Sequence, residues 1–187
     1  MKRAGAPRHE VRIVGGQWRR SLLPVADKPG LRPTPDRVRE TLFNWLGQDL
    51  SGWRVLDAFA GSGALGFEAA SRGAAAVLLL EQDAQLVASL NASRERLKAS
   101  AVRVQRGDAM SLLASAAPAS FDLVFLDPPF DSGWAHPALA RAARLLAPGG
   151  WVYLESGEPP PAEPPAGLVL YRAGRAGAVH FALFQAA

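Results

Sequence analysis

The feature that most constrains this chain is a regular alternation of strand and helix patterns that begins at Trp53. Strands are predicted at 53–57, 76–81, 102–105, 121–126 and 151–155, and helices at 64–71, 84–98, 109–116 and 138–146. The ranges 168–172 and 178–184 flank a glycine-containing turn and predict a closing hairpin. Alternation of this kind is typical of an α/β fold with a mostly parallel sheet and helices on both faces.

A glycine-rich turn joins the first of these strands to the helix that follows it. Gly61, Gly63 and Gly66 have the spacing G-x-G-x-x-G, and Phe59 and Ser62 belong to the same turn. The glycines let the backbone turn tightly and approach a ligand, while the start of the helix offers free N–H groups. The pattern alone fits a dinucleotide site, a nucleoside site or a purely structural turn.

Acidic residues end three successive strands, and they favour one of these ligands. Asp57 would repel a pyrophosphate but suits a ligand with a cationic centre and an amino group, such as S-adenosylmethionine. Glu81 can accept both ribose hydroxyls, and Asp108 can accept from the adenine amino group or cap the next helix. The predicted cofactor-binding residues are Asp57, Phe59, Gly61, Ser62, Gly63, Glu81, Gln82, Asp108 and Ala109.

The segment Asp127-Pro128-Pro129-Phe130 follows the fourth strand and suits an aromatic amine as substrate. Such an amine is a poor nucleophile because its lone pair is conjugated into the ring. Asp127 and the Pro128 carbonyl can each accept one N–H and turn the lone pair toward a methyl donor, on a loop that two prolines make stiff. Phe130 is predicted to stack on a flipped-out base. The alternative interpretation is that the two prolines only end the strand and that Phe130 is buried in the core.

With these motifs the chain resembles class I S-adenosylmethionine-dependent methyltransferases that modify exocyclic amino groups. The resemblance is closest to the RsmD family, which methylates the N2 amino group of a guanine in bacterial 16S ribosomal RNA. It runs from Arg12 to the end of the chain and is carried by the ranges 12–19, 31–46, 55–66 and 121–130. The first two, RIVGGQWR and LRPTPDRVRETLFNWL, are the most specific. Pro35 and the proline-rich range 158–165 depart from the family pattern.

The resemblance implies a Rossmann-like methyltransferase fold with a seven-stranded, mostly parallel sheet and an antiparallel last strand. It also implies S-adenosylmethionine as the donor, S-adenosylhomocysteine as the product, and 16S rRNA in an assembling small ribosomal subunit as the partner. We therefore expect residues 51–187 to form the catalytic domain. Residues 1–50 are expected to form a basic extension, a hairpin plus a helix, that contacts RNA and caps the site.

Within that extension, the range 11–18 predicts a short hairpin around Gly15 and Gly16. Thr34 is predicted to cap a helix that has Pro35 at its first position. The apolar stripe of this helix consists of Val38, Leu42, Trp45 and Leu46. Its exposed face is predicted to carry Arg37, Arg39 and Glu40, and the last two are a candidate surface ion pair.

The excess positive charge lies entirely in the first third of the chain. Residues 1–54 carry a net charge of +6, while residues 55–187 carry −2. A basic arm beside a slightly acidic body is typical of a protein that binds a polyphosphate, and residues 1–9 also fit a solvated, partly disordered basic tail. Predicted contacts with RNA phosphate are Arg12, Arg19 and Arg20. Predicted contacts around the cofactor or target base are Arg32, Thr34, Arg37 and Pro129.

The composition excludes several other classes. With 187 residues, 49% of them apolar, the chain can bury a substantial core. The absence of cysteine excludes disulfides, zinc–thiolate sites and a cysteine nucleophile, and the three histidines are too scattered to suggest a metal site. No apolar run approaches the ~18 residues needed to cross a bilayer. The first residues are polar and include no apolar segment, so we expect no cleaved secretory signal. We expect a metal-free, cytoplasmic monomer.

Other functions stay open at this point. An amino-methyltransferase acting on DNA adenine N6 or on another RNA would carry the same Asp-Pro-Pro-Phe segment. An NAD-dependent oxidoreductase is disfavoured by Asp57 and Asp127. A non-catalytic RNA-binding assembly factor is disfavoured by the complete set of motifs.

Overall fold

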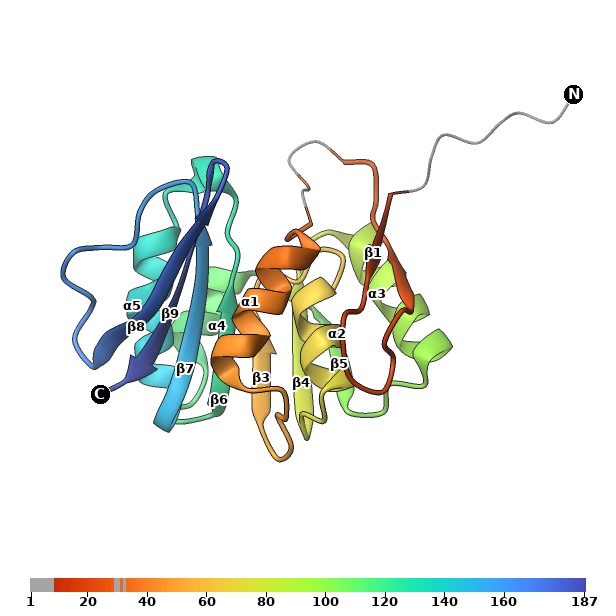
Figure 1. The fold of residues 1–187 in the computed structure, drawn as a ribbon, viewed down its shortest axis with the longest axis horizontal. Coiled ribbons are helices and arrows are strands. Elements are labelled where there is room, and N and C mark those ends of the chain that lie inside the picture. The colour runs from red at the N-terminus through yellow and green to blue at the C-terminus, as the bar shows by residue number, and fades with distance from the viewer. Residues whose placement is uncertain (1–8, 29–30, 32) are drawn as a thin grey trace, which may run out of the picture.

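Seven strands form a single twisted sheet in the computed structural model, which describes residues 9–28, 31 and 33–187 (Figure 1). Across the sheet the strand order is β5-β4-β3-β6-β7-β9-β8, and β9 runs antiparallel to both of its neighbours. The strands are β3 (Arg54–Asp57), β4 (Ala76–Glu81), β5 (Val102–Arg106), β6 (Phe121–Leu126), β7 (Leu146–Ser156), β8 (Leu168–Ala176) and β9 (Val179–Ala186). The predicted sheet, with seven strands and an antiparallel last strand, is confirmed. That last strand lies between β7 and the edge strand β8.

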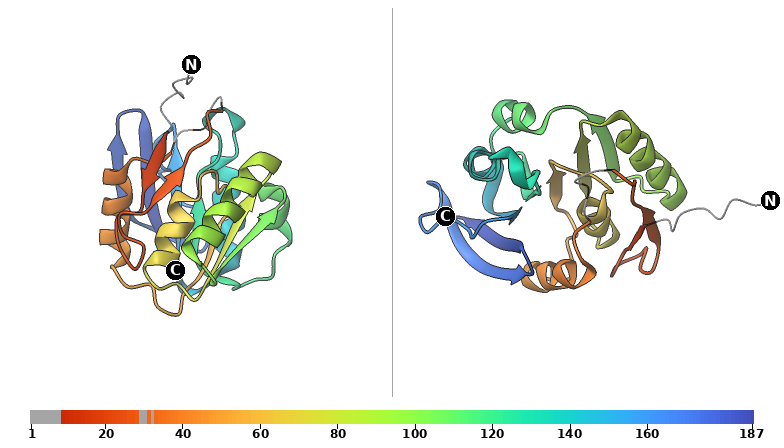
Figure 2. Two further views of the ribbon diagram at one scale, coloured as in Figure 1. Left: turned by 90° about the vertical axis from the view of Figure 1, so that its right-hand side faces the viewer. Right: turned by 90° about the horizontal axis from the view of Figure 1, so that it is seen from above.

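Helices cover both faces of this sheet (Figure 2). On one face lie α1 (Asp36–Leu46), α2 (Ala64–Ser71) and α3 (Ala84–Leu97); on the other lie α4 (Ala109–Ser115) and α5 (Ala135–Leu145). Each face of the sheet packs against its helices in a separate hydrophobic core, and the side chains of β6 alternate between the two. Leu123 and Phe125 belong to the core under α1, α2 and α3, while Val124 and Leu126 belong to the core under α4 and α5. In the described ranges, no helix has the length and apolar character needed to cross a membrane.

Element bounds agree with the predicted ones to within a few residues, with one larger difference. The strand β7 begins at Leu146, five residues before the predicted start of this strand, because Leu146 pairs with Phe121 across an irregularity in the register of β6 and β7. The segment Pro148-Gly149-Gly150, predicted to end the preceding helix, therefore lies inside the strand.

The N-terminal hairpin is wider than predicted. Its strands are β1 (Glu10–Arg12) and β2 (Leu22–Pro24), so the return strand lies beyond the predicted range 11–18. The connecting loop folds onto the end of α2: the Gln17 N–H donates to the Ser71 carbonyl, and the Ser71 hydroxyl donates to the Gly15 carbonyl. A Cβ on Gly16, whose φ is +78°, would lie 2.0 Å from the Ser71 carbonyl oxygen, so this close approach requires glycine.

The predicted division at residues 50 and 51 does not coincide with a break in the hydrophobic core. Ile13 and Leu23 of the hairpin belong to the same buried cluster as Phe43 of α1 and Val55 of β3. The described residues of the extension therefore pack as part of the sheet's first face, and their separate functional role stays a prediction.

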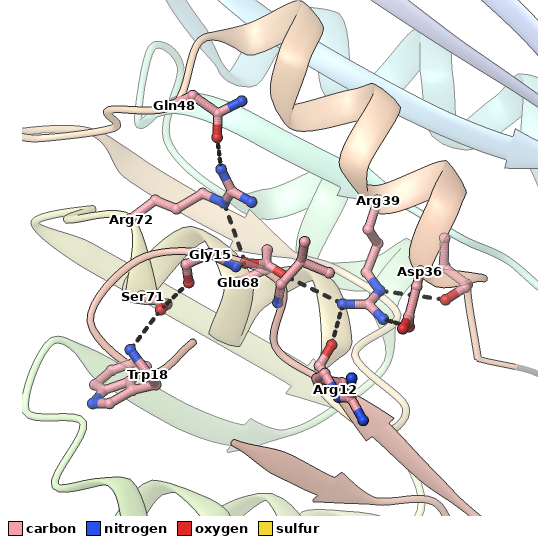
Figure 3. A network of polar contacts seen from close by, with 11 residues as sticks. Arg12, Gly15, Trp18, Asp36, Arg39, Gln48, Glu68, Ser71 and Arg72 are labelled. Atoms are coloured by element: carbon pink, nitrogen blue, oxygen red, sulfur yellow. Dashed lines mark hydrogen bonds and ion pairs between the residues drawn. The ribbon is translucent and has the colours of Figure 1, made fainter. Parts of the chain in front are cut away.

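Glu68 on α2 is fully buried and lies at the centre of a polar network that fixes the hairpin in place (Figure 3). Its carboxylate accepts the backbone N–H groups of Val14 at 2.8 Å and Gly15 at 3.0 Å. It also accepts Arg39 Nη1 at 3.1 Å and Arg72 Nε at 3.2 Å. With four donors, both oxygens of this buried charge are satisfied, which is the condition for tolerating an ion inside a protein.

The prediction that Arg39 is an exposed residue paired with Glu40 is wrong. The Arg39 side chain is 0% exposed and donates to the carbonyl oxygens of Arg12 and Thr34 as well as to Glu68. The reason is that the hairpin loop covers this face of α1, a long-range contact that the helical periodicity of the sequence does not reveal.

The prediction that Thr34 caps α1 is also wrong. The helix begins at Asp36, Pro35 occupies the cap position, and no side chain caps the first turn. Thr34 is buried, and its hydroxyl donates to Glu155 Oε1 at 2.7 Å. This hydrogen bond ties the start of α1 to the end of β7.

Substitution of Glu68 by Gln should lower the free energy of unfolding by about 3–5 kcal/mol. The amide keeps the size of the side chain but leaves the buried guanidinium groups of Arg39 and Arg72 without their shared counter-charge. Urea denaturation followed by circular dichroism measures the difference. The matched control is Glu95→Gln on the exposed side of α3, where we expect a change within about 0.5 kcal/mol. Equal effects of the two substitutions would contradict the role given to the network.

Candidate active site

Strand register brings three carboxyl groups to one edge of the sheet. Leu126 of β6 pairs with Leu154 of β7, so the next residues, Asp127 and Glu155, follow side by side at the strand ends. The adjacent strand β3 ends with Asp57 at the same edge. All three carboxyl groups line one cleft of about 860 Å³. Open α/β sheets bind their ligands at this edge, and the volume suits a ligand of nucleoside size or larger.

Most of the residues predicted for the site meet in this cleft. Its lining includes the predicted residues Thr34, Asp57, Phe59, Gly61, Ser62, Glu81, Gln82, Asp108, Ala109, Asp127, Pro128, Pro129 and Phe130. Gly63 is not part of the lining; it is buried with a φ of +83° at the start of α2, where a Cβ would lie 2.5 Å from the Phe67 ring. Among the residues that the structure describes, no three His, Asp or Glu side chains are grouped so as to hold a metal ion.

The predicted arginines that the structure describes do not line the cleft. Arg12, Arg19 and Arg20 are exposed on the hairpin and its loop. Arg37 is exposed on α1, and the structure does not bring it into the cleft. Arg32 lies outside the described residues.

Asp57 carries an unsatisfied oxygen inside the protein. The residue is 1% exposed, and its Oδ2 accepts the Gly66 N–H at 3.0 Å, while Oδ1 has no hydrogen-bond partner among the described residues. Burial raises the pKa of Asp57 to about 7, and the charges of Glu81 and Glu155 act in the same direction. A buried oxygen without a hydrogen-bond partner lowers the stability of the fold unless a ligand supplies a donor or a positive charge. Asp57 therefore fits the cationic cofactor predicted from the sequence.

Glu81 and Asp108 both organise the backbone around the cleft. Glu81 Oε2 accepts the Gly61 N–H at 2.9 Å, and Oε1 accepts the N–H of Gln82 at 3.0 Å, so Glu81 joins the glycine turn to the end of β4. Asp108 caps α4 by accepting the Ser111 N–H at 2.8 Å, while it also lines the cleft. The helix-cap interpretation of Asp108 is thus correct, and its predicted contact with adenine stays a prediction.

Sequence reasoning missed two side-chain pairings at this cleft. Lys28 donates to Asp83 Oδ2 at 2.6 Å, which connects the segment after β2 to the start of α3. The Phe59 and Trp134 rings stack with centroids 6.2 Å apart on the cleft wall. Asp83 is identifiable in the sequence as a helix cap, but no local pattern indicates Lys28 as its partner.

Glu155 is a further residue that sequence reasoning missed, although it ends a predicted strand just as Asp57 and Glu81 do. It accepts hydrogen bonds from the hydroxyl groups of Thr34 and Tyr153, and strand register places it beside Asp127. Burial raises the pKa of Asp127 well above its ordinary value, and the charge of Glu155 raises it further.

Phe130 occupies the first position of a 3₁₀ turn, η1 (Phe130–Ser132), beside these carboxyl groups. The residue is 50% exposed. The alternative interpretation, in which the prolines only end the strand and Phe130 is buried, is therefore wrong. Its ring lies at the cleft, where a planar ligand can reach it. The predicted stacking on a base stays a prediction.

The strand order, the glycine turn after the first parallel strand and the acid-lined cleft define the class I S-adenosylmethionine-dependent methyltransferase fold. Residues 11–185 match the family model described as "Conserved hypothetical protein 95", and the chain belongs to this family, the RsmD family. The predicted fold class and family are confirmed.

Similar proteins cover nearly the whole chain. "Ribosomal RNA small subunit methyltransferase D" of Escherichia coli (strain K12) is 45% identical over 186 residues, which is 94% of this chain and 90% of that protein. The protein of the same name from Haemophilus influenzae is 40% identical over 192 residues, which is 99% of this chain and 100% of that protein. Among solved structures, "Putative methyltransferase yhhF from Escherichia coli" has a TM-score of 0.85 at 43% identity and covers 95% of this chain and 98% of its own.

Replacing Asp57 by Asn should change how stability depends on pH in the ligand-free protein. The pKa of Asp57 is about 7 in the folded state, and its ordinary value, which applies to the unfolded chain, is 3.8. Between these two pH values the carboxyl group is protonated only in the folded state. This carboxyl therefore makes stability fall as pH rises through that interval. The stability of the native chain relative to Asp57→Asn should decrease from about pH 4 to about pH 7 and level off above.

Urea denaturation at a series of pH values measures this difference. The control is Asp27→Asn, which changes an exposed carboxyl and should give a nearly constant offset over the same range. A constant offset for Asp57→Asn as well would contradict the assignment of a buried, readily protonated Asp57.

Proposed function

We propose that the protein transfers a methyl group from S-adenosylmethionine to the exocyclic N2 amino group of a specific guanine in 16S rRNA. The substrate is the RNA within an assembling small ribosomal subunit, and the enzyme acts as a cytoplasmic monomer. The observation that carries this proposal is the meeting of Asp127, the exposed Phe130 and the glycine turn in one cleft. The names of the relatives, which are ribosomal RNA small subunit methyltransferases, support the substrate class.

The cofactor would be held by residues at the ends of β3, β4 and β5. Asp57 offers its unpartnered carboxylate oxygen to the cationic part of the molecule, Glu81 offers acceptors to the ribose, and Asp108 lies near the position proposed for adenine. Phe59 and Ala109 add apolar surface to the same wall. When bound, S-adenosylmethionine supplies an activated methyl group and is converted to S-adenosylhomocysteine.

Asp127 and the Pro128 carbonyl prepare the acceptor. Each accepts one N–H of the guanine amino group, so that the nitrogen lone pair turns out of conjugation and toward the methyl group. The methylated nitrogen then loses one proton. Asp127, whose pKa is raised by burial and by the charge of Glu155, is suited to receive that proton. Much of the rate enhancement comes from holding the two reactants together, an effect that can contribute roughly 7–11 kcal/mol.

Phe130 provides the surface on which the target base rests. Its exposed ring can stack on the face of a flipped-out guanine, an interaction worth about 1–3 kcal/mol per base. Pro129 is exposed beside it and is proposed to contact the same nucleotide. Thr34, Arg32 and Arg37 complete the set of residues proposed near the target base or the adjoining RNA.

Residues 1–50 are proposed to hold the RNA backbone against the catalytic domain. Arg12, Arg19 and Arg20 are exposed on a hairpin that Glu68 anchors to α2, so their positive charges have a fixed position relative to the cleft. Neutralisation of phosphates by such residues releases counterions and gives salt-dependent affinity.

The proposal is tested by incubating the protein with methyl-labelled S-adenosylmethionine and unmodified small-subunit particles, followed by nucleoside analysis. We expect label in N2-methylguanosine. Asp127→Ala should lower the rate at least about 100-fold, because the amino group is no longer oriented, while its affinity for S-adenosylmethionine stays within about twofold.

Glu163→Ala is the matched control, since it removes an exposed carboxyl in the proline-rich segment outside the cleft lining. It should retain full activity. Label found in adenosine, or no label at all, would contradict the proposed substrate. Normal turnover by Asp127→Ala would contradict the proposed mechanism.

Charge reversal of Arg12, Arg19 and Arg20 to Glu should weaken binding to small-subunit RNA. It should also flatten the plot of log affinity against log salt, by about 0.7–0.9 in slope for each phosphate that is no longer neutralised. Fluorescence anisotropy at several salt concentrations measures both effects.

The control reverses Arg172 and Arg175 on the edge strand β8, far from the hairpin (Figure 1). This control should leave the salt slope nearly unchanged. If the hairpin variant keeps the native affinity and slope, these three arginines do not bind the RNA.

A further inference from the structure

The mechanism above leaves Glu155 without a role, although it is a buried carboxyl group on the wall of the cleft. Glu155 is 4% exposed at the end of β7, and register places it beside Asp127. A carboxyl group is rarely buried without specific partners, because removing its charge from water is costly. Its partners therefore indicate what it does.

Two hydroxyl groups hold Glu155 by the same oxygen. Tyr153 donates to Oε1 at 2.6 Å, and Thr34 donates to Oε1 at 2.7 Å. Asp127 lies beside Glu155, because Leu126 pairs with Leu154 in the register of β6 and β7, and both carboxyl groups line the cleft. Two neighbouring carboxyl groups removed from water share one proton more readily than they both ionise, so the pair carries one proton and one negative charge.

The charges around the pair favour this state. From β3, Asp57 adds a further acidic group. From α1, Arg39 attracts Glu155 electrostatically, but its guanidinium group already pairs with Glu68. On β9 the register partner of Glu155 is Phe181, which carries no charge. Among the residues that the structure describes, two fully ionised carboxylates therefore lack the positive charge they would need at this position.

We propose that Glu155 is a positioning residue for methyl transfer, which fixes the orientation of the Asp127 carboxylate by sharing a proton with it. This inference rests on the proposed function, in which Asp127 accepts the amino N–H. With one oxygen bound to Glu155, Asp127 has its other oxygen available for the substrate. The pair holds one negative charge, so it can take the single proton that the methylated nitrogen loses and later pass it to water.

The same contacts connect this pair to the RNA-binding extension. Arg39 Nε donates to the Thr34 carbonyl at 3.3 Å, and Arg39 is itself held by Glu68 beneath the hairpin. Thr34 thus has its backbone fixed by the network of Figure 3 and its hydroxyl directed to Glu155.

The test compares Glu155→Gln with Glu155→Ala in the small-subunit methylation assay over a range of pH. The glutamine retains an oxygen for Thr34 and Tyr153 and offers an N–H to Asp127, but it carries no charge. We expect Glu155→Gln to stay active and the acid limb of its kcat profile to move to lower pH, because the charge that raises the pKa of Asp127 is removed. Glu155→Ala should lose about 100-fold in kcat, with KM for the particle and affinity for S-adenosylmethionine within about twofold.

Glu158→Gln is the matched control, because Glu158 is an exposed carboxyl three residues along the chain, outside the cleft lining. It should reproduce the native rate and pH profile. A native pH profile for Glu155→Gln, or native kcat for Glu155→Ala, overturns the proposal. If Glu155→Ala does not fold, the pH profile of Glu155→Gln decides alone. If the native protein puts no methyl group on guanine, the proposed function fails first and this inference fails with it.

Discussion

Three neighbouring strands, β3, β6 and β7, end in carboxyl groups, and the properties of the site follow from this convergence. Register places Asp57, Asp127 and Glu155 at one edge of the sheet, where burial opposes their ionisation and raises their pKa values. A cluster of this kind is costly for folding, but it provides acceptors that need little reorganisation when a cationic ligand and an amine arrive. The unsatisfied Oδ1 of Asp57 marks the place where a ligand would relieve that cost.

The second determinant of the site is the way in which the N-terminal hairpin is attached. Glu68 binds two backbone N–H groups of the hairpin loop and two arginines, so a segment with little secondary structure of its own has a defined position. Arg39 extends this network to Thr34, and Thr34 extends it to Glu155. The hairpin that is proposed to bind RNA and the Asp127 that is proposed to prepare the amine are therefore linked through neighbouring residues.

Much of the fold could be predicted from the sequence because parallel α/β structure has a strong local pattern. The strand 121–126, the glycine turn and Asp127 follow from periodicity and spacing, and so does their meeting at one sheet edge. The failures have a common physical cause. Thr34 and Glu155 are 121 positions apart, and Lys28 and Asp83 are 55 apart, so no local pattern reveals either hydrogen bond. Arg39 was predicted to be exposed because helical periodicity does not include the loop that covers it.

The most direct test of this account is a crystal structure of the protein with S-adenosylhomocysteine and an RNA fragment containing the target guanine. The account predicts that the thioether sulfur and the guanine amino group face each other across the cleft, with the Asp127 carboxylate hydrogen-bonded to that amino group and to Glu155. A complex in which the guanine binds elsewhere, or in which Asp127 turns away from the amino group, would contradict it.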